Sequence, residues 1–189
     1  MCIRDRSNSG SDSNGFGDGA TGLAVDANGD AYVTGYASSS DFPVTSGAIQ
    51  STNKAVVVSG YEPFLSELNS AGSALVYSTY LGGSGGYPTP TFDVPTGDVA
   101  NALAMDGSGG VYLAGYAASS DFPVTTGAYQ TTNHGAPGRF TNAFVAKLDL
   151  STINTAGATT TCLLYTSTDC AQLAAATADG FLGHLWRAQ

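Results

Sequence analysis

Three oxygen-bearing side chains at alternating positions, Asp26, Asn28 and Asp30, carry the clearest metal-ligand chemistry of the chain. This spacing is like the start of a calcium-binding loop, in which carboxylate and amide oxygens surround the ion. The segment returns 80 residues later as Asp-Gly-Ser-Gly-Gly, which loses the last acid, and neither copy has a Glu at the twelfth position. We therefore favour a hairpin turn, in which Asp accepts hydrogen bonds from turn N–H groups. Calcium is retained as the alternative, and no other cofactor or metal is expected.

Catalytic chemistry has few candidates in the body of the chain, residues 7–161. Its single histidine, His134, lies in a loop with Gly and Pro and has no histidine counterpart 80 positions earlier. Nucleophilic catalysis needs a base held near a Ser or Thr, and a solvated loop histidine is the simpler interpretation. Glu62 and Glu67 are acids of the kind that glycosidases pair, but their counterparts, Asn142 and Lys147, are not acids. We assign no catalytic residue and leave enzymatic activity open, favouring its absence.

Composition excludes several classes of partner. The chain has 15 acidic and 6 basic residues and a formal net charge of −9, so it lacks the clustered Lys and Arg of a nucleic-acid surface. No run of 18 apolar residues occurs, which predicts no transmembrane helix. The glycine run at residues 82–86 lacks the Lys and the following helix of a phosphate-binding loop. It predicts a flexible loop.

The two ends of the chain look foreign to the rest. Met-Cys-Ile-Arg-Asp at the start and Cys-Leu-Leu-Tyr-Thr-Ser at residues 162–167 can be encoded by the two strands of one short oligonucleotide. That oligonucleotide resembles the transposon end used as an adapter in shotgun sequencing libraries. We therefore expect residues 1–16 to be artefactual or unstructured and residues 162–189 to be a foreign tail on a metagenomic fragment. A secretory signal would then lie upstream of the fragment.

Excluding these ends changes the cysteine count. Cys2, Cys162 and Cys170 all fall in the suspect segments, and the body contains no cysteine. Neither a disulfide framework nor a thiolate metal site is supported.

An internal repeat organises the body. From Ala20 to Asn53, 21 of 34 residues are identical to those 80 positions later, without a gap. Such self-similarity is the signature of a repeat architecture. The positions we interpret as structural are Asp18 and Asp98, Asp26 and Asp106, Gly29 and Gly109, Tyr32 and Tyr112, Gly35 and Gly115, Asp41 and Asp121, Phe42 and Phe122, and Pro43 and Pro123.

Each repeat is predicted to form four short antiparallel strands. Bulky residues alternate with small or hydroxyl residues, glycine turns separate the apolar segments, and no sustained helical periodicity occurs in the body. In the first repeat the expected strands are residues 23–26, 31–36, 63–68 and 74–81. A repeated four-stranded sheet favours radial stacking, as in a propeller, over a sandwich.

The Asp-Phe-Pro motif lies in the long loop after the second strand of each repeat. We expect Asp41 and Asp121 to cap this loop through an Asx-type hydrogen bond. Phe42 and Phe122 would plug the gap between neighbouring sheets. Asp18 and Asp98, which precede the first strand, are interpreted in the same structural way.

Three segments together resemble the bacterial SBBP-type β-propeller repeat. They are Gly-Leu-Ala-Val-Asp-Ala-Asn-Gly-Asp-Ala-Tyr-Val-Thr-Gly-Tyr (residues 22–36), Ser-Ser-Asp-Phe-Pro (39–43) and Ala-Leu-Val-Tyr-Ser-Thr-Tyr-Leu-Gly-Gly (74–83). The resemblance covers residues 17–150. It implies a multi-bladed propeller within a large secreted or surface-attached bacterial protein, with no common catalytic activity. The chain departs from it in the long insertion at 82–97, and at the last strand of the second repeat, where Leu-Leu-Tyr-Thr-Ser of the suspect tail stands.

These observations combine into one expectation: an all-β partial propeller of two four-stranded antiparallel blades, the second incomplete. The expected function is a non-catalytic scaffold or recognition module, extracellular or at the cell surface. The alternative is a fragment of a propeller enzyme or carbohydrate-binding propeller with its site in further blades. Expected partners are further blades of the same chain and a protein or glycan ligand, without nucleic acid or a membrane span. The chain is expected to divide into an N-terminal segment (residues 1–16), a first repeat (17–97), a second, incomplete repeat (98–161) and a foreign tail (162–189).

Overall fold

A computed structural model describes residues 17–55, 60–86, 97–106, 108–135 and 140–150, together with the backbone of residues 159–165. These residues form two four-stranded antiparallel sheets, and none of them lies in an α-helix. The all-β expectation of two repeated sheets is therefore confirmed. No helix in this described part of the chain could cross a membrane.

The first sheet is a meander in which each strand pairs with the next one along the chain. Its strands are β1 (Gly19–Val25), β2 (Ala31–Ala37), β3 (Glu62–Leu68) and β4 (Leu75–Tyr80). β1 begins four residues earlier than expected, because Gly19 and Ala20 still pair with Tyr36 and Gly35 beyond a bulge. A side chain at Gly35 would overlap the Gly19 carbonyl, so glycine is required where the two backbones approach.

The second sheet repeats this order with β5 (Val99–Met105), β6 (Gly110–Ala117), β7 (Asn142–Asp149) and β8 (Thr159–Tyr165). β8 pairs along β7 from Asp149 opposite Thr159 to Ala143 opposite Tyr165. The body of the chain thus supplies three complete strands to the second sheet, as expected, and residues 162–165 of the suspect tail complete the fourth. Whether residues 162–189 are foreign stays a prediction, and residues 166–189 lie outside the described part.

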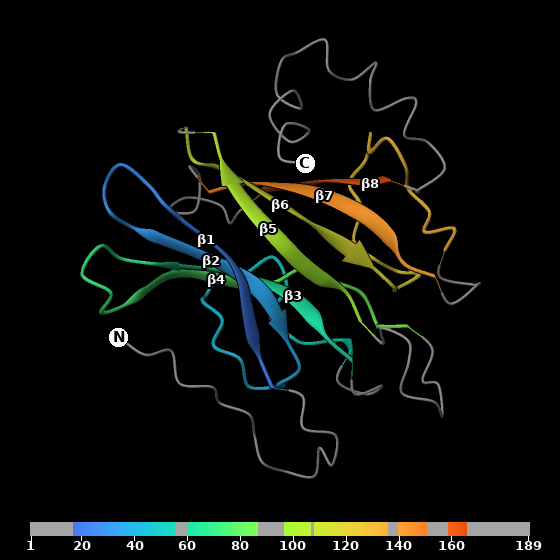
Figure 1. Ribbon diagram of the computed structural model, residues 1–189, viewed down its shortest axis with the longest axis horizontal. Coiled ribbons are helices and arrows are strands. Elements are labelled where there is room, and N and C mark those ends of the chain that lie inside the picture. The colour runs from blue at the N-terminus through green and yellow to red at the C-terminus, as the bar shows by residue number, and fades with distance from the viewer. Residues whose placement is uncertain are drawn as a thin grey trace.

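The two sheets pack face against face, and β1 and β2 lie next to β5 (Figure 1). We call the side of the first sheet that meets the second its inner face; it carries Tyr32, Leu65 and Tyr77. These side chains join a core that includes Leu113 and Phe144 of the second sheet. The sheets also touch through backbone, because the Thr21 hydroxyl donates a hydrogen bond to the Ala100 carbonyl. Burial of this shared apolar surface is the main force holding the repeats together.

The opposite, outer face of the first sheet is covered in part by its own long loop. The Phe42 ring lies 4.5 Å from the ring centre of Phe64 in β3 and 5.7 Å from that of Tyr80 in β4. Phe42 thus packs on its own sheet, on a face that no other described sheet covers, and its expected place between two sheets stays a prediction. Phe122 stacks in the same way on Phe144, at 4.6 Å, but that cluster is the core shared with the first sheet.

The same loop protects the free edge of β4. Thr45 donates its N–H to the Ser78 carbonyl (3.1 Å), and Tyr80 donates its N–H to the Gln50 carbonyl (3.1 Å). An uncovered edge would present unpaired backbone groups to other chains. The loop therefore supplies hydrogen-bond partners to backbone groups at the free edge of β4, and it does so from within the same repeat.

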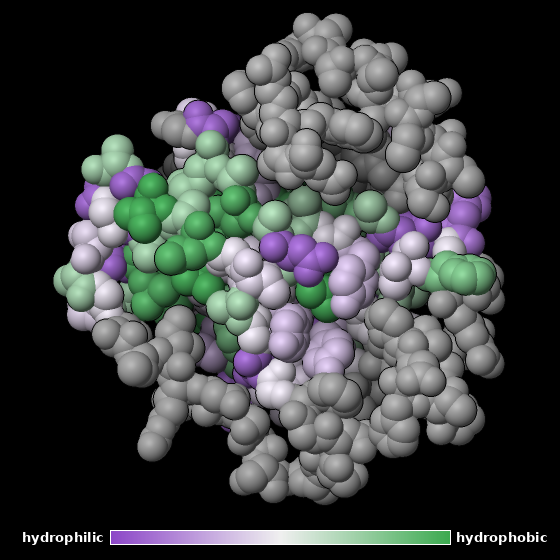
Figure 2. Space-filling view, viewed as in Figure 1, coloured by the Kyte–Doolittle hydropathy of each residue, from purple (hydrophilic) through white to green (hydrophobic). Residues whose placement is uncertain are grey.

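Equivalent leucines of the two repeats differ in their surroundings. Leu103 packs against the shared core, with its Cβ facing the backbone position of Gly22. Leu23, its counterpart, lies on the outer face and is 66% exposed. Figure 2 shows hydrophobic side chains gathered on the side of the view where β1 lies in Figure 1. Val25, which is 60% exposed, is the other large apolar residue of β1 at this surface.

The leucine pair gives the first testable prediction. Leu103→Ala should lower the free energy of unfolding by about 1–2 kcal/mol, because it removes buried methyl groups and leaves a gap between the sheets. Leu23→Ala, the matched control, should change it by less than about 0.5 kcal/mol. Urea titration of both variants followed by circular dichroism measures the difference. Equal effects at the two positions would contradict the packing described.

Candidate functional site

The repeated acid before each first strand organises the loop that follows β2 or β6. Asp18 accepts hydrogen bonds from the N–H groups of Ser38 (2.8 Å) and Ser39 (3.1 Å) and from the Ser39 hydroxyl (2.6 Å). Asp98 accepts the same three bonds from residues 118 and 119, at 2.7, 2.9 and 2.6 Å. The structural interpretation of both acids agrees with this geometry, since each carboxylate holds backbone N–H groups of its own loop.

A repeated asparagine closes the same loop from its other end. Asn53 donates its Nδ2 to the carbonyls of Ala37 (3.1 Å) and Ser39 (3.2 Å), and its Oδ1 accepts the Ala55 N–H (2.9 Å). Asn133 makes the matching bonds in the second repeat. Sequence reasoning did not select these asparagines. Their identity in both copies was the available signal, because both lie within the segment of 34 aligned positions.

The glycine run after β4 crosses from the first repeat to the second. Gly83 donates its N–H to Asp98 Oδ2 (2.9 Å), and Ser84 donates its N–H to Asp121 Oδ1 (2.8 Å). Gly85 donates its N–H to the Ser119 hydroxyl (3.0 Å). The loop expected to be flexible is thus held by three successive backbone donors, an arrangement that favours anionic oxygen. We name this set of contacts the latch.

The latch shows that the role expected for Asp121 was wrong, and it explains why residue 83 is glycine. Asp121 was expected to cap its own loop, but the hydrogen bonds it accepts come from Ser84 of the preceding repeat, through N–H and hydroxyl. A Cβ at Gly83 would overlap both the Asp121 carboxylate and the Ser119 side chain. Only glycine lets the backbone come this close.

A second buried acid lies beside the latch. Glu62, which is fully buried, accepts hydrogen bonds from Gln50 Nε2 (2.6 Å) and from the Lys54 N–H (3.0 Å). Burial raises its pKa to about 7, and the neighbouring charge of Asp98 adds to the rise. Burial also raises the pKa of Asp98, against the four hydrogen bonds that favour its ionised form. The backbone at Gly82 lies against both acids, near Glu62 Cγ and Asp98 Oδ2.

The candidate calcium residues form hairpin turns. Asp26 Oδ1 accepts the N–H groups of Asn28 (2.9 Å) and Asp30 (2.8 Å), and Gly29 has a φ of 88°. In this geometry the first acid serves its own turn, as the hairpin interpretation predicts. The described residues contain no group of three or more His, Cys, Asp or Glu side chains that could hold a metal ion. Calcium binding stays a prediction.

The corresponding turn of the second repeat adds a charge pair. Asp106 accepts bonds from the Ser108 N–H and hydroxyl, at 2.9 and 2.8 Å, and lies 3.2 Å from the Lys147 ammonium. The hydrogen bonds from Ser108 hold the pKa of Asp106 well below its usual range. Because the pair is partly exposed, it contributes little to stability.

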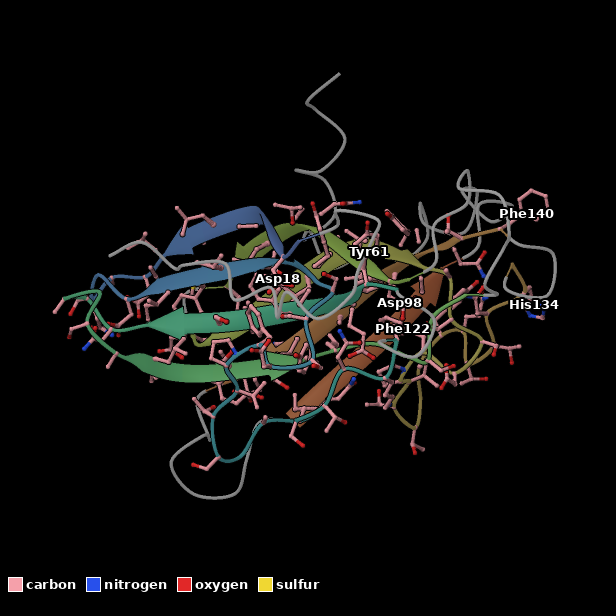
Figure 3. All side chains as sticks on the ribbon, turned by 90° about the horizontal axis from the view of Figure 1, so that it is seen from below. Asp18, Tyr61, Asp98, Phe122, His134 and Phe140 are labelled. Carbon is pink, nitrogen blue, oxygen red and sulfur yellow. The ribbon has the colours of Figure 1, made fainter. Side chains whose placement is uncertain are left out.

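The lone body histidine lies away from these acids. Figure 3 places His134 at the periphery beside Phe140, at a distance from Asp18 and Asp98. Within the described part of the chain no Ser or Thr hydroxyl is hydrogen-bonded to His134, and the Glu67 carboxyl is hydrogen-bonded to Tyr32. The residues that the fold brings together are therefore those that hold loops in place. The acids do so by accepting hydrogen bonds from backbone N–H groups, and Asn53 and Asn133 also donate hydrogen bonds to backbone carbonyls.

The latch yields a paired prediction. Asp121→Ala should lower the free energy of unfolding by about 0.5–1.5 kcal/mol, because the Ser84 N–H and hydroxyl lose their acceptor. Asp41→Ala, the matched variant in the first repeat, should have an effect below about 0.5 kcal/mol, since no described residue donates to Asp41. Thermal melts of the two variants test the difference, and a larger loss at Asp41 would refute the assignment.

Glu62 yields a prediction of pH dependence. The folded state holds the Glu62 proton more tightly than the unfolded chain, so this stabilisation is present below pH 4.5 and disappears as pH rises to about 7. Glu62→Gln should remove on the order of 1–3 kcal/mol of the fall in unfolding free energy over this range. Urea titrations at several pH values measure the slope, with Asp41→Asn as the control for an exposed carboxylate. An unchanged slope in Glu62→Gln would contradict the prediction.

Comparison with known proteins finds one family that matches a segment of the first repeat. Residues 18–43 match the SBBP beta-propeller repeat. The matched segment begins at Asp18, includes β1 and β2, and ends at the proline of Asp-Phe-Pro. The resemblance inferred from sequence is confirmed over this segment. No curated protein matches the chain.

Proposed function

We propose that this β-propeller repeat module serves as a non-catalytic scaffold or recognition surface of a secreted or cell-surface bacterial protein. The observation that carries the proposal is the use of its repeated polar residues. Asp18, Asp98, Asn53 and Asn133 all bind backbone groups of their own loops, and Asp98 also binds the neighbouring repeat. Residues that are repeated because they hold the fold together support a structural role.

Composition supports the extracellular part of the proposal. The chain has only 11% charged residues and a net charge of −9, so its surface is dominated by small polar groups and acids. A net charge far from zero favours solubility without fixing a fold. An extracellular scaffold needs little more than such a surface and stable blades.

A recognition role has one specific support. Tyr36 and Tyr61 meet edge to face with ring centres 5.0 Å apart, and both are partly exposed. Burial raises the pKa of Tyr61 to about 12, and the neighbouring Tyr36 and its counterpart Tyr116 add to the rise. Figure 3 shows Tyr61 between Asp18 and Asp98. Half-buried tyrosines combine an apolar ring with a polar tip. This chemistry suits a glycan or protein ligand, so it also supports the alternative of a carbohydrate-binding propeller.

Localisation tests the first part of the proposal. Cells producing the full-length protein should release it to the medium or display it in a form that added protease degrades on intact cells. Immunoblotting of medium, intact-cell and lysate fractions gives the measurement, with a cytoplasmic protein as the control for lysis. Retention in the cytoplasm would refute the extracellular proposal.

Ligand binding tests the recognition part separately. On a glycan array, binding that is lost in Tyr36→Ala and kept in Tyr129→Ala, an exposed tyrosine of the loop in the second repeat, would support recognition by the tyrosine cluster. Binding unaffected by Tyr36→Ala would place recognition elsewhere.

A further inference from the structure

We propose that Tyr36 and Tyr61 form an oxidative cross-linking site, at which a peroxidase with hydrogen peroxide joins the two phenol rings into dityrosine. This inference goes beyond the proposed function. It concerns a covalent modification of the first repeat, and it holds whether the module is a scaffold or binds a ligand.

The register of β2 and β3 brings the two rings together. Tyr36 of β2 pairs with Pro63 of β3, and Tyr61 stands two residues before Pro63, directly ahead of the strand. Side chains two positions apart along a strand share a face, and diagonal neighbours across two antiparallel strands are within reach of aromatic rings. The rings meet accordingly, with centres 5.0 Å apart and planes inclined at 68°.

Backbone packed against both tyrosines holds this arrangement. A Cβ at Gly19 would overlap the Tyr36 ring, so the start of β1 lies directly against that ring. A Cβ at Gly97 would overlap the backbone of Tyr61, whose carbonyl accepts the Asp98 N–H (2.9 Å). The two rings are therefore neighbours before any reaction, and such proximity favours coupling between them over coupling to other molecules. Both tyrosines are partly exposed, which gives an oxidant access to them.

The reaction balances with one molecule of hydrogen peroxide. Each phenol gives up one electron and its O–H proton and becomes a phenoxyl radical, and the peroxidase uses the two electrons and two protons to reduce hydrogen peroxide to two water molecules. The unpaired electron is spread over the oxygen and over the ring carbons ortho and para to it, but the para carbon already carries the side chain. The radicals therefore join through a C–C bond between ortho carbons. The two ortho hydrogens then move to the oxygens and restore the phenols.

The second repeat has the same strands without the partner ring. Tyr116 stands at the position of Tyr36 and pairs with Ala143. Thr141 occupies the position of Tyr61. The chain thus contains a matched site in which only one of the two phenols is present at the corresponding positions.

The test oxidises the full chain with a haem peroxidase and hydrogen peroxide and identifies cross-linked peptides by mass spectrometry. The expected product links the peptides of Tyr36 and Tyr61 with the loss of two hydrogen atoms, in a yield that does not depend on protein concentration. Tyr36→Phe and Tyr61→Phe should each lower the yield of dityrosine within one chain at least about tenfold. Tyr129→Phe, at an exposed tyrosine, should leave it unchanged. No dityrosine, or cross-links that join other tyrosines equally often, would overturn the proposal.

A gain of cross-linking at the matched site tests the register argument. Thr141→Tyr should add a second link, to Tyr116, and circular dichroism shows whether this variant folds like the natural chain. A folded variant without the second link would overturn the proposal.

The modification also has a consequence for stability. A bond between residues 36 and 61 closes the long loop of the first repeat at its base, which removes conformations from the unfolded chain. Oxidation should therefore raise the folded-to-unfolded ratio about tenfold in the natural chain and leave it unchanged in Tyr61→Phe. Urea titrations before and after oxidation give both ratios. Equal responses of the two chains would overturn the proposal, because the link would then not join native neighbours.

Discussion

The packing of the two repeats depends on one buried carboxylate, that of Asp98, which accepts hydrogen bonds from both of them. Asp98 is fully buried and accepts four hydrogen bonds, three from the loop of its own repeat and one from Gly83 of the preceding repeat. A buried charge is costly unless it is hydrogen-bonded. The loop after β6 and the glycine run therefore have to be in place together, which couples the folding of one repeat to the docking of the other.

This coupling pairs side-chain acceptors of one repeat with backbone donors of the other, and that explains the composition of the joint. The acceptors are Asp98, Asp121 and Ser119, and the donors are N–H groups of a glycine-rich loop. Small residues are needed because the backbone of one repeat lies directly against the polar side chains of the other. A module joined in this way can be repeated many times, since each joint requires the same few short residues.

The two repeats are not equivalent at the second buried acid. Glu62 is held by Gln50 and Lys54 in the first repeat, whereas Asn142 takes its place in the second and its buried Nδ2 has no partner in the described part. Gln50 is buried and also accepts the Gly82 N–H (3.1 Å), whereas its counterpart Gln130 is only partly buried and donates to the Thr132 carbonyl in an exposed hydrogen bond. The first repeat thus carries a pH-sensitive acid at the point where its chain leaves for the next repeat.

The period of 80 residues, the all-β class and the turns at Gly29 and Gly109 could be predicted from the amino-acid sequence, because strand alternation and turn chemistry are local properties of the chain. Four contacts could be read only from the folded chain: Asp121 accepts hydrogen bonds from Ser84, Glu62 is buried, Phe42 packs on its own sheet and β8 pairs with β7. Each of these depends on which groups of distant segments meet in space. Residue type marks Asp121 as an acceptor, but a hydrogen-bond donor 37 positions away becomes its partner only when the sheets stack and bring the two loops together.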